Sequence, residues 1–151
     1  MPLRVAVVVA VVIVFMTPLG RNLMASGAKI LSSPPAAVAG LIICIAGLGL
    51  AIWARVVMGR NWGMPMTLQR GQELVTGGPY AYVRHPIYAA ILVAMLGSAL
   101  AISLWWLVFF IVNGAQFFFA AKREEQLMLQ TFPETYPAYM RQTRMLIPFV
   151  F

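Results

Sequence analysis

The chain has 151 residues, of which 62% are hydrophobic and 10% are charged, and its formal net charge is +7. A soluble domain carries roughly a quarter charged residues, so this composition excludes an ordinary soluble protein and predicts one integral membrane domain over residues 1–151. The positive charge does not predict a nucleic-acid partner, because the basic residues are spread along membrane edges, where they set topology and meet the head groups of membrane lipids.

Long stretches without charged residues predict an all-α integral membrane bundle of about four transmembrane helices. Residues 86–121 form the longest such stretch. As one helix they would span roughly 54 Å, against about 30 Å of hydrocarbon. A C-terminal helical hairpin is therefore the better interpretation, with its turn in the region from Gly97-Ser98 to Ser103. The predicted helices cover residues 4–20, 35–57, 86–101 and 104–122.

Small residues recur along the predicted helix 35–57. Gly40, Gly47 and Ala51 allow another helix to approach closely. Cys44 lies among apolar residues of the same helix and is expected to be a small core residue. As the only cysteine of the chain, it can form no intrachain disulfide. The sequence of this helix therefore indicates close packing against another helix and says little about function.

The placement of Lys and Arg predicts how the chain crosses the membrane. With four spans, one side receives the N-terminus, the connector 55–85 and the C-terminal tail. All basic residues except Arg21 and Lys29 fall on that side, and so do all acidic residues. Because basic residues favour the cytoplasmic side, both termini and any site formed beside them are expected to be cytoplasmic.

Residues 77–88, with the sequence GGPYAYVRHPIY, place several special residues where a polar connector meets the apolar hairpin. Ionisable groups at such a position are costly, so they indicate a functional site. Gly77-Gly78-Pro79 allows a tight turn whose backbone N–H groups can approach a ligand. Arg84 offers a planar fork for a carboxylate. His85-Pro86 opens a helix, and the N-terminus of a helix attracts anionic groups.

A second charged cluster, Lys122-Arg123-Glu124-Glu125, ends the last predicted transmembrane helix. Adjacent helical residues point about 100° apart, so Glu124 and Glu125 cannot both face one ligand. One of them can accept hydrogen bonds from a ribose diol or an ammonium group. The other is expected to pair with an arginine.

Two further segments flank these clusters. The connector 55–84 exceeds the roughly 12–15 residues beyond which loops are usually functional or disordered, and its aromatic and Met residues favour a cap over a cavity. The tail after residue 122 continues as a helix until Pro133 and Pro137 break it. Its apolar end, residues 146–151, is expected to fold back on the protein or to lie in the membrane interface.

Together the two clusters are suited to a zwitterionic, nucleoside-containing cofactor at the membrane interface. S-adenosylmethionine has an amino-acid end, a ribose and a sulfonium cation, and aromatic faces stabilise such a cation. Methyl transfer is an in-line displacement that needs alignment of the reacting groups more than acid–base machinery. An apolar acceptor would enter this site sideways from the bilayer.

Three blocks, GRNWG, LVTGGPYAYVRHPIY and REEQLMLQTFPETYPAYMRQTRMLIPF, resemble the isoprenylcysteine carboxyl methyltransferase family and its prokaryotic relatives. Phospholipid N-methyltransferases are distant kin. The resemblance covers residues 55–149 and implies S-adenosylmethionine as the cofactor, with S-adenosylhomocysteine as the product. It further implies a lipophilic acceptor with an isoprenylcysteine-type carboxylate, with a phospholipid amine or a thiol as the alternative. The expected location is a bacterial inner membrane.

By position in these blocks, the resemblance also implies the site residues. Those that bind the cofactor are Tyr80, Val83, Arg84, His85, Pro86, Tyr88, Glu124 and Glu125. Arg84, Arg123 and Arg141 are the catalytic candidates, the last two for gripping an acceptor carboxylate, and no metal ion is implied. His85 is interpreted as part of a cofactor clamp and not as a base. Ala90 stands where the family often has Gly, which is expected to narrow the local helix contact.

Two other classes of protein share part of this pattern. Membrane sterol reductases have a related Arg-His-Pro-Asn-Tyr segment and use NADPH. Here Ile87 replaces the Asn and an Arg-Glu-Glu sequence follows, which favours methyl transfer over hydride transfer. A non-enzymatic binding or transport protein predicts polar residues in mid-membrane, and the predicted spans are nearly devoid of them, with Asn113 and Gln116 as the exceptions. The sequence leaves the oligomeric state open.

Overall fold

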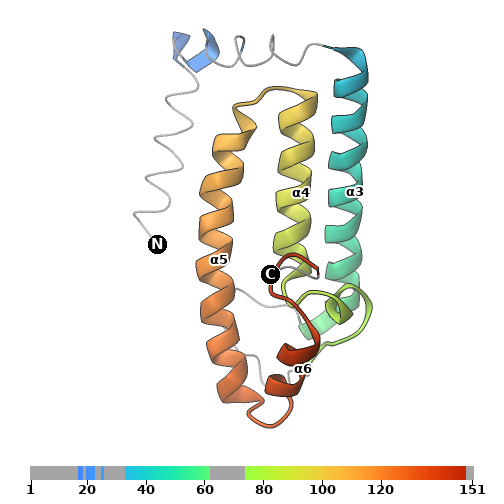
Figure 1. Cartoon of the computed structure of the whole chain (residues 1–151), viewed down its shortest axis with the longest axis vertical. Coiled ribbons are helices and arrows are strands. Elements are labelled where there is room, and N and C mark those ends of the chain that lie inside the picture. Colours follow the sequence, from blue (N-terminus) through green and yellow to red (C-terminus); the bar gives the residue numbers. More distant parts are fainter. Residues whose placement is uncertain (1–16, 19, 23–24, 26–32, 62–73, 149–151) are drawn as a thin grey trace.

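The structure, a computed structural model, describes residues 17–18, 20–22, 25, 33–61 and 74–148. Three long helices stand side by side (Figure 1), namely α3 (Pro34–Met58), α4 (Pro86–Ala101) and α5 (Trp106–Thr131). Near one end of them lie the short helix α6 (Tyr136–Gln142) and two 3-10 turns, η1 (Gly59–Asn61) and η2 (Gly78–Ala81). Within the described ranges the chain has no β-strand, which confirms the predicted all-α class.

Helix α3 is, in the part of the chain that the structure describes, the one helix that is long and apolar enough to cross a membrane, and α4 is apolar but shorter. Many large apolar side chains of α3 are exposed, among them Leu41, Ile45 and Ile52. Such a surface fits a helix surrounded by lipid. The count of four spans stays a prediction, because the helix expected over residues 4–20 falls almost entirely outside the described ranges.

Helices α4 and α5 form the predicted hairpin, and α4 covers the predicted helix 86–101. The turn between Ala101 and Trp106 overlaps only the end of the region from Gly97-Ser98 to Ser103 in which we expected it. Gly97 is a contact residue and not a turn residue, since a Cβ there would clash with the backbone of Cys44 in α3. Ser98 also lies within α4, where its hydroxyl donates a hydrogen bond of 3.0 Å to the Ala94 carbonyl of the preceding turn.

Close packing of α3 on α4 depends on small residues, as predicted. A Cβ added to Gly40 would lie 2.5 Å from the backbone nitrogen of Ala101, and one added to Gly47 would lie 2.6 Å from that of Ala94. Ala90 is fully buried in the same contact, and its carbonyl oxygen lies 2.8 Å from the position of a Gly47 Cβ. Gly47 on α3 therefore allows the backbone of α4 to approach closely at Ala90 and Ala94.

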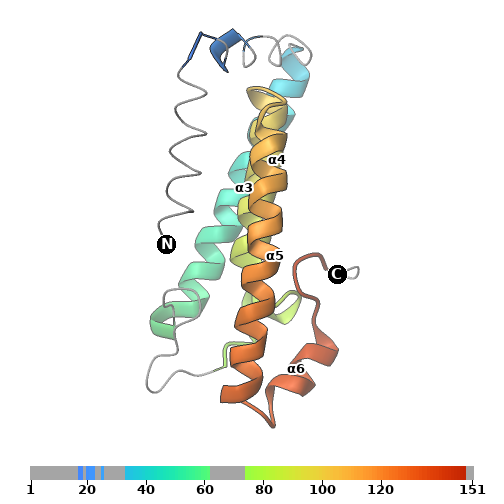
Figure 2. The ribbon, with the colours of Figure 1, turned by 90° about the vertical axis from the view of Figure 1, so that its left-hand side faces the viewer.

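Helix α5 extends past the predicted end of its membrane segment at residue 122 and continues to Thr131. It ends where Pro133 prevents a further helical turn, with the Phe132 N–H donating to the Met128 carbonyl at 2.8 Å. The chain then forms α6 and returns along the lower half of the bundle (Figure 2). As a result, Glu124 and Glu125 lie on a helical extension that the tail can reach.

Candidate active site

The segment before α4 and the C-terminal tail are joined by backbone hydrogen bonds. The Arg84 N–H donates to the Arg144 carbonyl at 2.8 Å, and the His85 N–H donates to the Met145 carbonyl at 3.1 Å. In the opposite direction, the Arg144 N–H donates to the Tyr82 carbonyl at 3.3 Å. The tail thus folds back at Arg144 and Met145, directly before the apolar end 146–151 for which a fold-back was predicted, and residues 149–151 of that end lie outside the described ranges.

A tight turn and a tyrosine hydroxyl fix the backbone around Tyr80. Gly78 has a φ of 60°, in the left-handed region that glycine adopts without strain, which confirms the predicted turn. The Tyr139 hydroxyl donates a 2.7 Å hydrogen bond to the Tyr80 carbonyl, and both side chains are buried. In turn, the Thr143 hydroxyl donates to the Tyr139 carbonyl at 2.8 Å. Helix α6 is thereby attached to η2.

Arg84 ties this segment to α5 and to the tail. Its Nε donates to Glu125 Oε1 at 2.6 Å, with side-chain exposures of 10% and 6% for the two residues. Its Nη1 donates to the Thr143 carbonyl at 2.6 Å and to the Met140 carbonyl at 3.3 Å. The prediction that one of the two adjacent glutamates pairs with an arginine is therefore confirmed, with Glu125 as the partner.

His85 lies between the two carboxylates of α5. Its Nδ1 is 3.3 Å from Glu124 Oε2, and its Nε2 is 3.6 Å from Glu125 Oε1. The imidazole is only 9% exposed, and within the described ranges its Nε2 has no hydrogen-bond partner. The two glutamates diverge on the helix, yet each reaches one ring nitrogen of this single histidine. The buried Nε2 leaves a polar atom of the cluster unsatisfied, which in native proteins calls for an explanation.

Tyr88 supports Glu124 from α4. The Tyr88 hydroxyl donates a hydrogen bond of 2.5 Å to Glu124 Oε1. The Tyr88 ring stacks on Phe117 of α5 with a centroid distance of 4.7 Å, and it lies nearly parallel to the His85 ring at 5.7 Å. The orientation of the Glu124 carboxylate is therefore set by a side chain that is itself held by aromatic packing.

The charged groups of this cluster shift the pKa values of His85 and Glu125. Burial by itself favours the neutral imidazole, but the interactions with the Glu124 and Glu125 carboxylates outweigh it and raise the pKa of His85. Burial likewise disfavours the charged form of Glu125, but His85 and Arg84 outweigh it and lower the pKa of that carboxyl. Both shifts favour the charged forms of the histidine and of Glu125.

A pocket of about 90 Å³ opens beside the cluster. Its charged lining groups are Arg84, His85 and Glu124, and the other described residues that line it are Met58, Asn61, Leu74, Val75, Tyr80, Met128, Tyr136 and Tyr139. Burial raises the pKa of Tyr139 to about 12 and also raises the pKa values of Tyr80 and Tyr136. The tyrosines therefore offer neutral hydroxyls and aromatic faces to any occupant.

Most of the residues expected to bind a cofactor either line this pocket or lie directly beside it. Tyr80, Arg84, His85 and Glu124 line the pocket itself. The others contact this group without lining the pocket: Glu125 and Tyr88 through the bonds described above, and Val83 and Pro86 as buried residues of the supporting backbone. Pro86 is at the start of α4, in the first helical turn, where proline is favoured.

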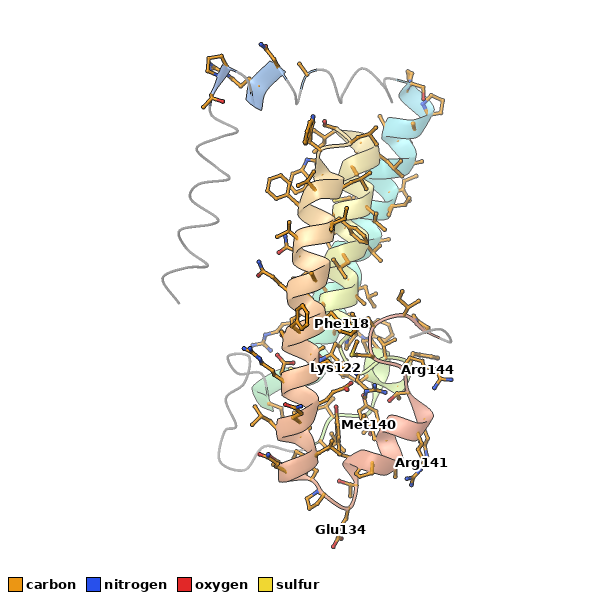
Figure 3. The ribbon with its side chains drawn as sticks, turned by 60° about the vertical axis from the view of Figure 1, so that its left-hand side comes forward. Phe118, Lys122, Glu134, Met140, Arg141 and Arg144 are labelled. Carbon is orange, nitrogen blue, oxygen red and sulfur yellow. The ribbon has the colours of Figure 1, made fainter. Side chains whose placement is uncertain are left out.

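Two of the catalytic candidates lie apart from the pocket. Arg123 and Arg141 are exposed, and neither lines the pocket. In Figure 3, Arg141 extends away from the helical bundle. Sequence reasoning also missed Tyr136, Tyr139 and Met128 as lining residues. A signal was present for the tyrosines, since they are three residues apart and share one face of the short helix after Pro133.

The fold and the site together define a helical membrane protein with a charged pocket at one end of its bundle. The chain belongs to the phospholipid methyltransferase family, which matches residues 35–135. That range includes the segment Tyr80–Tyr88 and both glutamates, whereas α6 and the tail lie beyond it. A comparison with curated protein sequences gave no match.

A solved structure of a eukaryotic intramembrane Ras methyltransferase, isoprenylcysteine carboxyl methyltransferase, has a similar fold. The TM-score is 0.64 and the sequence identity is 27%, and the match covers 76% of this chain and 43% of that one. The chain thus spans less than half the length of this relative. The similarity confirms the suspected kinship with isoprenylcysteine carboxyl methyltransferases and the membrane type of the fold.

Proposed function

We propose that the protein is an S-adenosylmethionine-dependent methyltransferase that acts on a lipophilic acceptor at the membrane interface. The observation that carries this proposal is the pocket lined by His85, Glu124 and three tyrosines, inside the region that matches the phospholipid methyltransferase family. The family match also favours methyl transfer over the NADPH-dependent reduction considered as an alternative.

The residues of the pocket fit this cofactor. Glu124 offers a carboxylate oxygen to a ribose diol or an ammonium group, while its other contacts with Tyr88 and His85 hold it in place. The unpartnered Nε2 of His85 is a buried polar atom at the same site. The faces of Tyr136 and Tyr139 suit a sulfonium cation, because the electron-rich face of an aromatic ring attracts positive charge.

We assign Arg84 a positioning role. Its guanidinium already donates to Glu125 and to two backbone carbonyls, so its Nε and Nη1 are committed to the protein. When bound, the cofactor supplies an electrophilic methyl group. The protein then contributes orientation and exclusion of water, which can account for a large part of the rate of a bimolecular displacement.

The acceptor is proposed to be an isoprenylcysteine-type carboxylate, as in the similar solved structure, with Arg123 or Arg141 near its carboxylate. A phospholipid amine is the second candidate, and the family match favours it. The two acceptors differ in the product bond, since one yields a methyl ester and the other an N-methyl group. A thiol acceptor would yield a thioether.

A labelled-methyl transfer assay tests the activity and separates these acceptors. Purified protein is incubated with labelled S-adenosylmethionine and either a synthetic prenylcysteine, a phosphatidylethanolamine or a lipid extract. Label that mild base releases as methanol identifies a methyl ester, and label that base does not convert to methanol identifies an amine or thioether product. Glu124→Gln should abolish transfer, whereas Glu134→Gln, at an exposed carboxylate that does not line the pocket, should not. Absence of transfer to every acceptor would overturn the proposal.

We also propose that the site faces the cytoplasm, in a bacterial inner membrane. Exposed cations surround the pocket end of the bundle, among them Lys122, Arg123 and Arg141. Basic residues favour the cytoplasmic side of a membrane. Protease or label access to a C-terminal tag in oriented membrane vesicles measures this orientation directly.

A further inference from the structure

We propose that His85 sets the preference of the pocket between a sulfonium cofactor and its thioether product, by releasing a proton when the positively charged ligand binds. The inference rests on the proposed function and adds a selectivity-determining role for one residue. S-adenosylmethionine and S-adenosylhomocysteine differ by one methyl group and one positive charge. A pocket that responds to charge can therefore distinguish them.

The geometry supplies a chain of ionisable groups that ends at the pocket. Tyr88 donates to Glu124 at 2.5 Å, and Glu124 lies 3.3 Å from His85. His85 lies 3.6 Å from Glu125, and Glu125 accepts from Arg84 at 2.6 Å. With a protonated histidine the two cations and two carboxylates cancel. With a neutral histidine the cluster carries one net negative charge.

The charged groups that contact His85 or its partners come from α5, α4 and the segment of His85 itself. Helix α5 contributes Glu124 and Glu125, the segment of His85 itself contributes Arg84, and α4 contributes Tyr88. The remaining titratable groups that line the pocket are the tyrosines of η2 and α6, namely Tyr80, Tyr136 and Tyr139. Burial makes these tyrosines harder to ionise. Histidine is the side chain whose ordinary titration falls near neutral pH, so His85 is the group that can exchange a proton there.

A cation placed in this pocket competes with the proton on His85. The imidazole is 9% exposed and lines the pocket, so charges there are poorly screened by water. Its Nε2 has no hydrogen-bond partner within the described ranges, so loss of the proton from this atom gives up the 3.6 Å ion pair with Glu125 but no hydrogen bond. The neutral imidazole then leaves Glu124 and Glu125 with an excess negative charge that favours the sulfonium. The sulfur of the thioether product is uncharged, so loss of the His85 proton does not favour binding of the product.

Thermodynamic linkage between proton release and ligand binding gives the expected change of affinity with pH. If the sulfonium displaces one proton, the affinity for S-adenosylmethionine rises by up to about tenfold per pH unit in the range where His85 is protonated, while that for S-adenosylhomocysteine changes much less. The ratio of the two affinities therefore increases with pH and levels off once the free protein has lost the proton.

The experiment is isothermal calorimetry of the full chain in detergent, at several pH values between about 6 and 8. Each titration is repeated in two buffers of different ionisation enthalpy, so that the difference in heat counts the protons released. The ligands are S-adenosylmethionine, S-adenosylhomocysteine and an analogue with an ammonium group in place of the sulfonium. A His85→Gln variant reports the protons that come from the ligands' own amino groups.

We expect both cationic ligands to release more protons than S-adenosylhomocysteine, and His85→Gln to remove the difference. Because His85 is the only histidine of the chain, its NMR signal in a protein without a histidine tag gives an independent readout that needs no variant. That signal should move toward the neutral form when a cationic ligand is added. Equal proton release by charged and neutral ligands would overturn this inference and leave the proposed function intact. No binding of any ligand by folded protein would overturn both.

Discussion

Arg84 and Glu125 are 41 residues apart in the sequence, and their side chains meet at 2.6 Å in the interior. This pair joins the segment before α4 to the helical extension of α5. His85 follows Arg84 directly and Glu124 precedes Glu125, so the pair also brings these two pocket residues to within 3.3 Å of each other. The positions of His85 and Glu124 in the candidate site therefore depend on the Arg84–Glu125 ion pair, which lies beside them.

Arg84→Met should destabilise the protein by about 3–5 kcal/mol, because it leaves the buried Glu125 carboxylate without its cation. Thermal unfolding in detergent measures this loss. Adding Glu125→Leu should restore part of it, since a buried pair can be replaced by apolar groups at lower cost than breaking it. Arg141→Met is the matched control at an exposed arginine and should leave the melting temperature unchanged. A similar loss in both single variants would refute the structural role of the pair.

Gly47→Ala should destabilise the protein, because the added Cβ would lie 2.6 Å from the backbone nitrogen of Ala94. Overpacking of this kind costs about 1–3 kcal/mol. Gly49→Ala is the internal control two residues away on α3, where a Cβ meets nothing within 4 Å. It should stabilise the helix by about 0.5–1 kcal/mol. Equal changes in melting temperature would contradict the packing of α3 on α4.

Tyr139→Phe should weaken the attachment of α6 to η2, because it removes the hydroxyl that donates to the Tyr80 carbonyl at 2.7 Å. A buried carbonyl left without its donor costs about 1–3 kcal/mol. Hydrogen exchange should show faster opening of the backbone at Tyr82–His85, which pairs with the tail. Tyr82→Phe is the control, since that side chain is 61% exposed, and it should leave exchange unchanged. Unaltered exchange in Tyr139→Phe would argue against this attachment.

The stability of the protein should pass through a maximum as pH is varied. The pKa of His85 is raised on folding, so its contribution is complete below its ordinary value of 6.5 and is lost as pH rises through the folded value. The pKa of Glu125 is lowered, so its contribution is present above its ordinary value of 4.5 and is lost as pH falls through the folded value.

Melting temperatures measured across this pH range check the two limbs separately. His85→Gln should flatten the decline on the alkaline side, and Glu125→Gln should flatten the decline on the acidic side. A wild-type profile that keeps rising above pH 6.5 would show that the carboxylates do not stabilise a protonated histidine.

Sequence patterns predicted the long apolar helices, the break at Pro133 and the turn at Gly78, because each follows from local composition or backbone chemistry. The pairing of one glutamate with an arginine followed from helical geometry. Which glutamate pairs was not predictable, because it depends on how α5 is rotated against the segment of Arg84. The backbone bonds of Arg144 and Met145 arise from tertiary contacts and leave no periodic signal in the sequence.

The most direct test of the central claim is calorimetric titration of S-adenosylhomocysteine into the purified, folded protein and into two isosteric variants. The wild type and Glu134→Gln should bind with the same affinity, whereas Glu124→Gln should bind about tenfold or more weakly, because a hydrogen bond to a charged group contributes about 1.5–3 kcal/mol. No binding by the wild type, or equal binding by Glu124→Gln, would contradict the assignment of this pocket as the cofactor site.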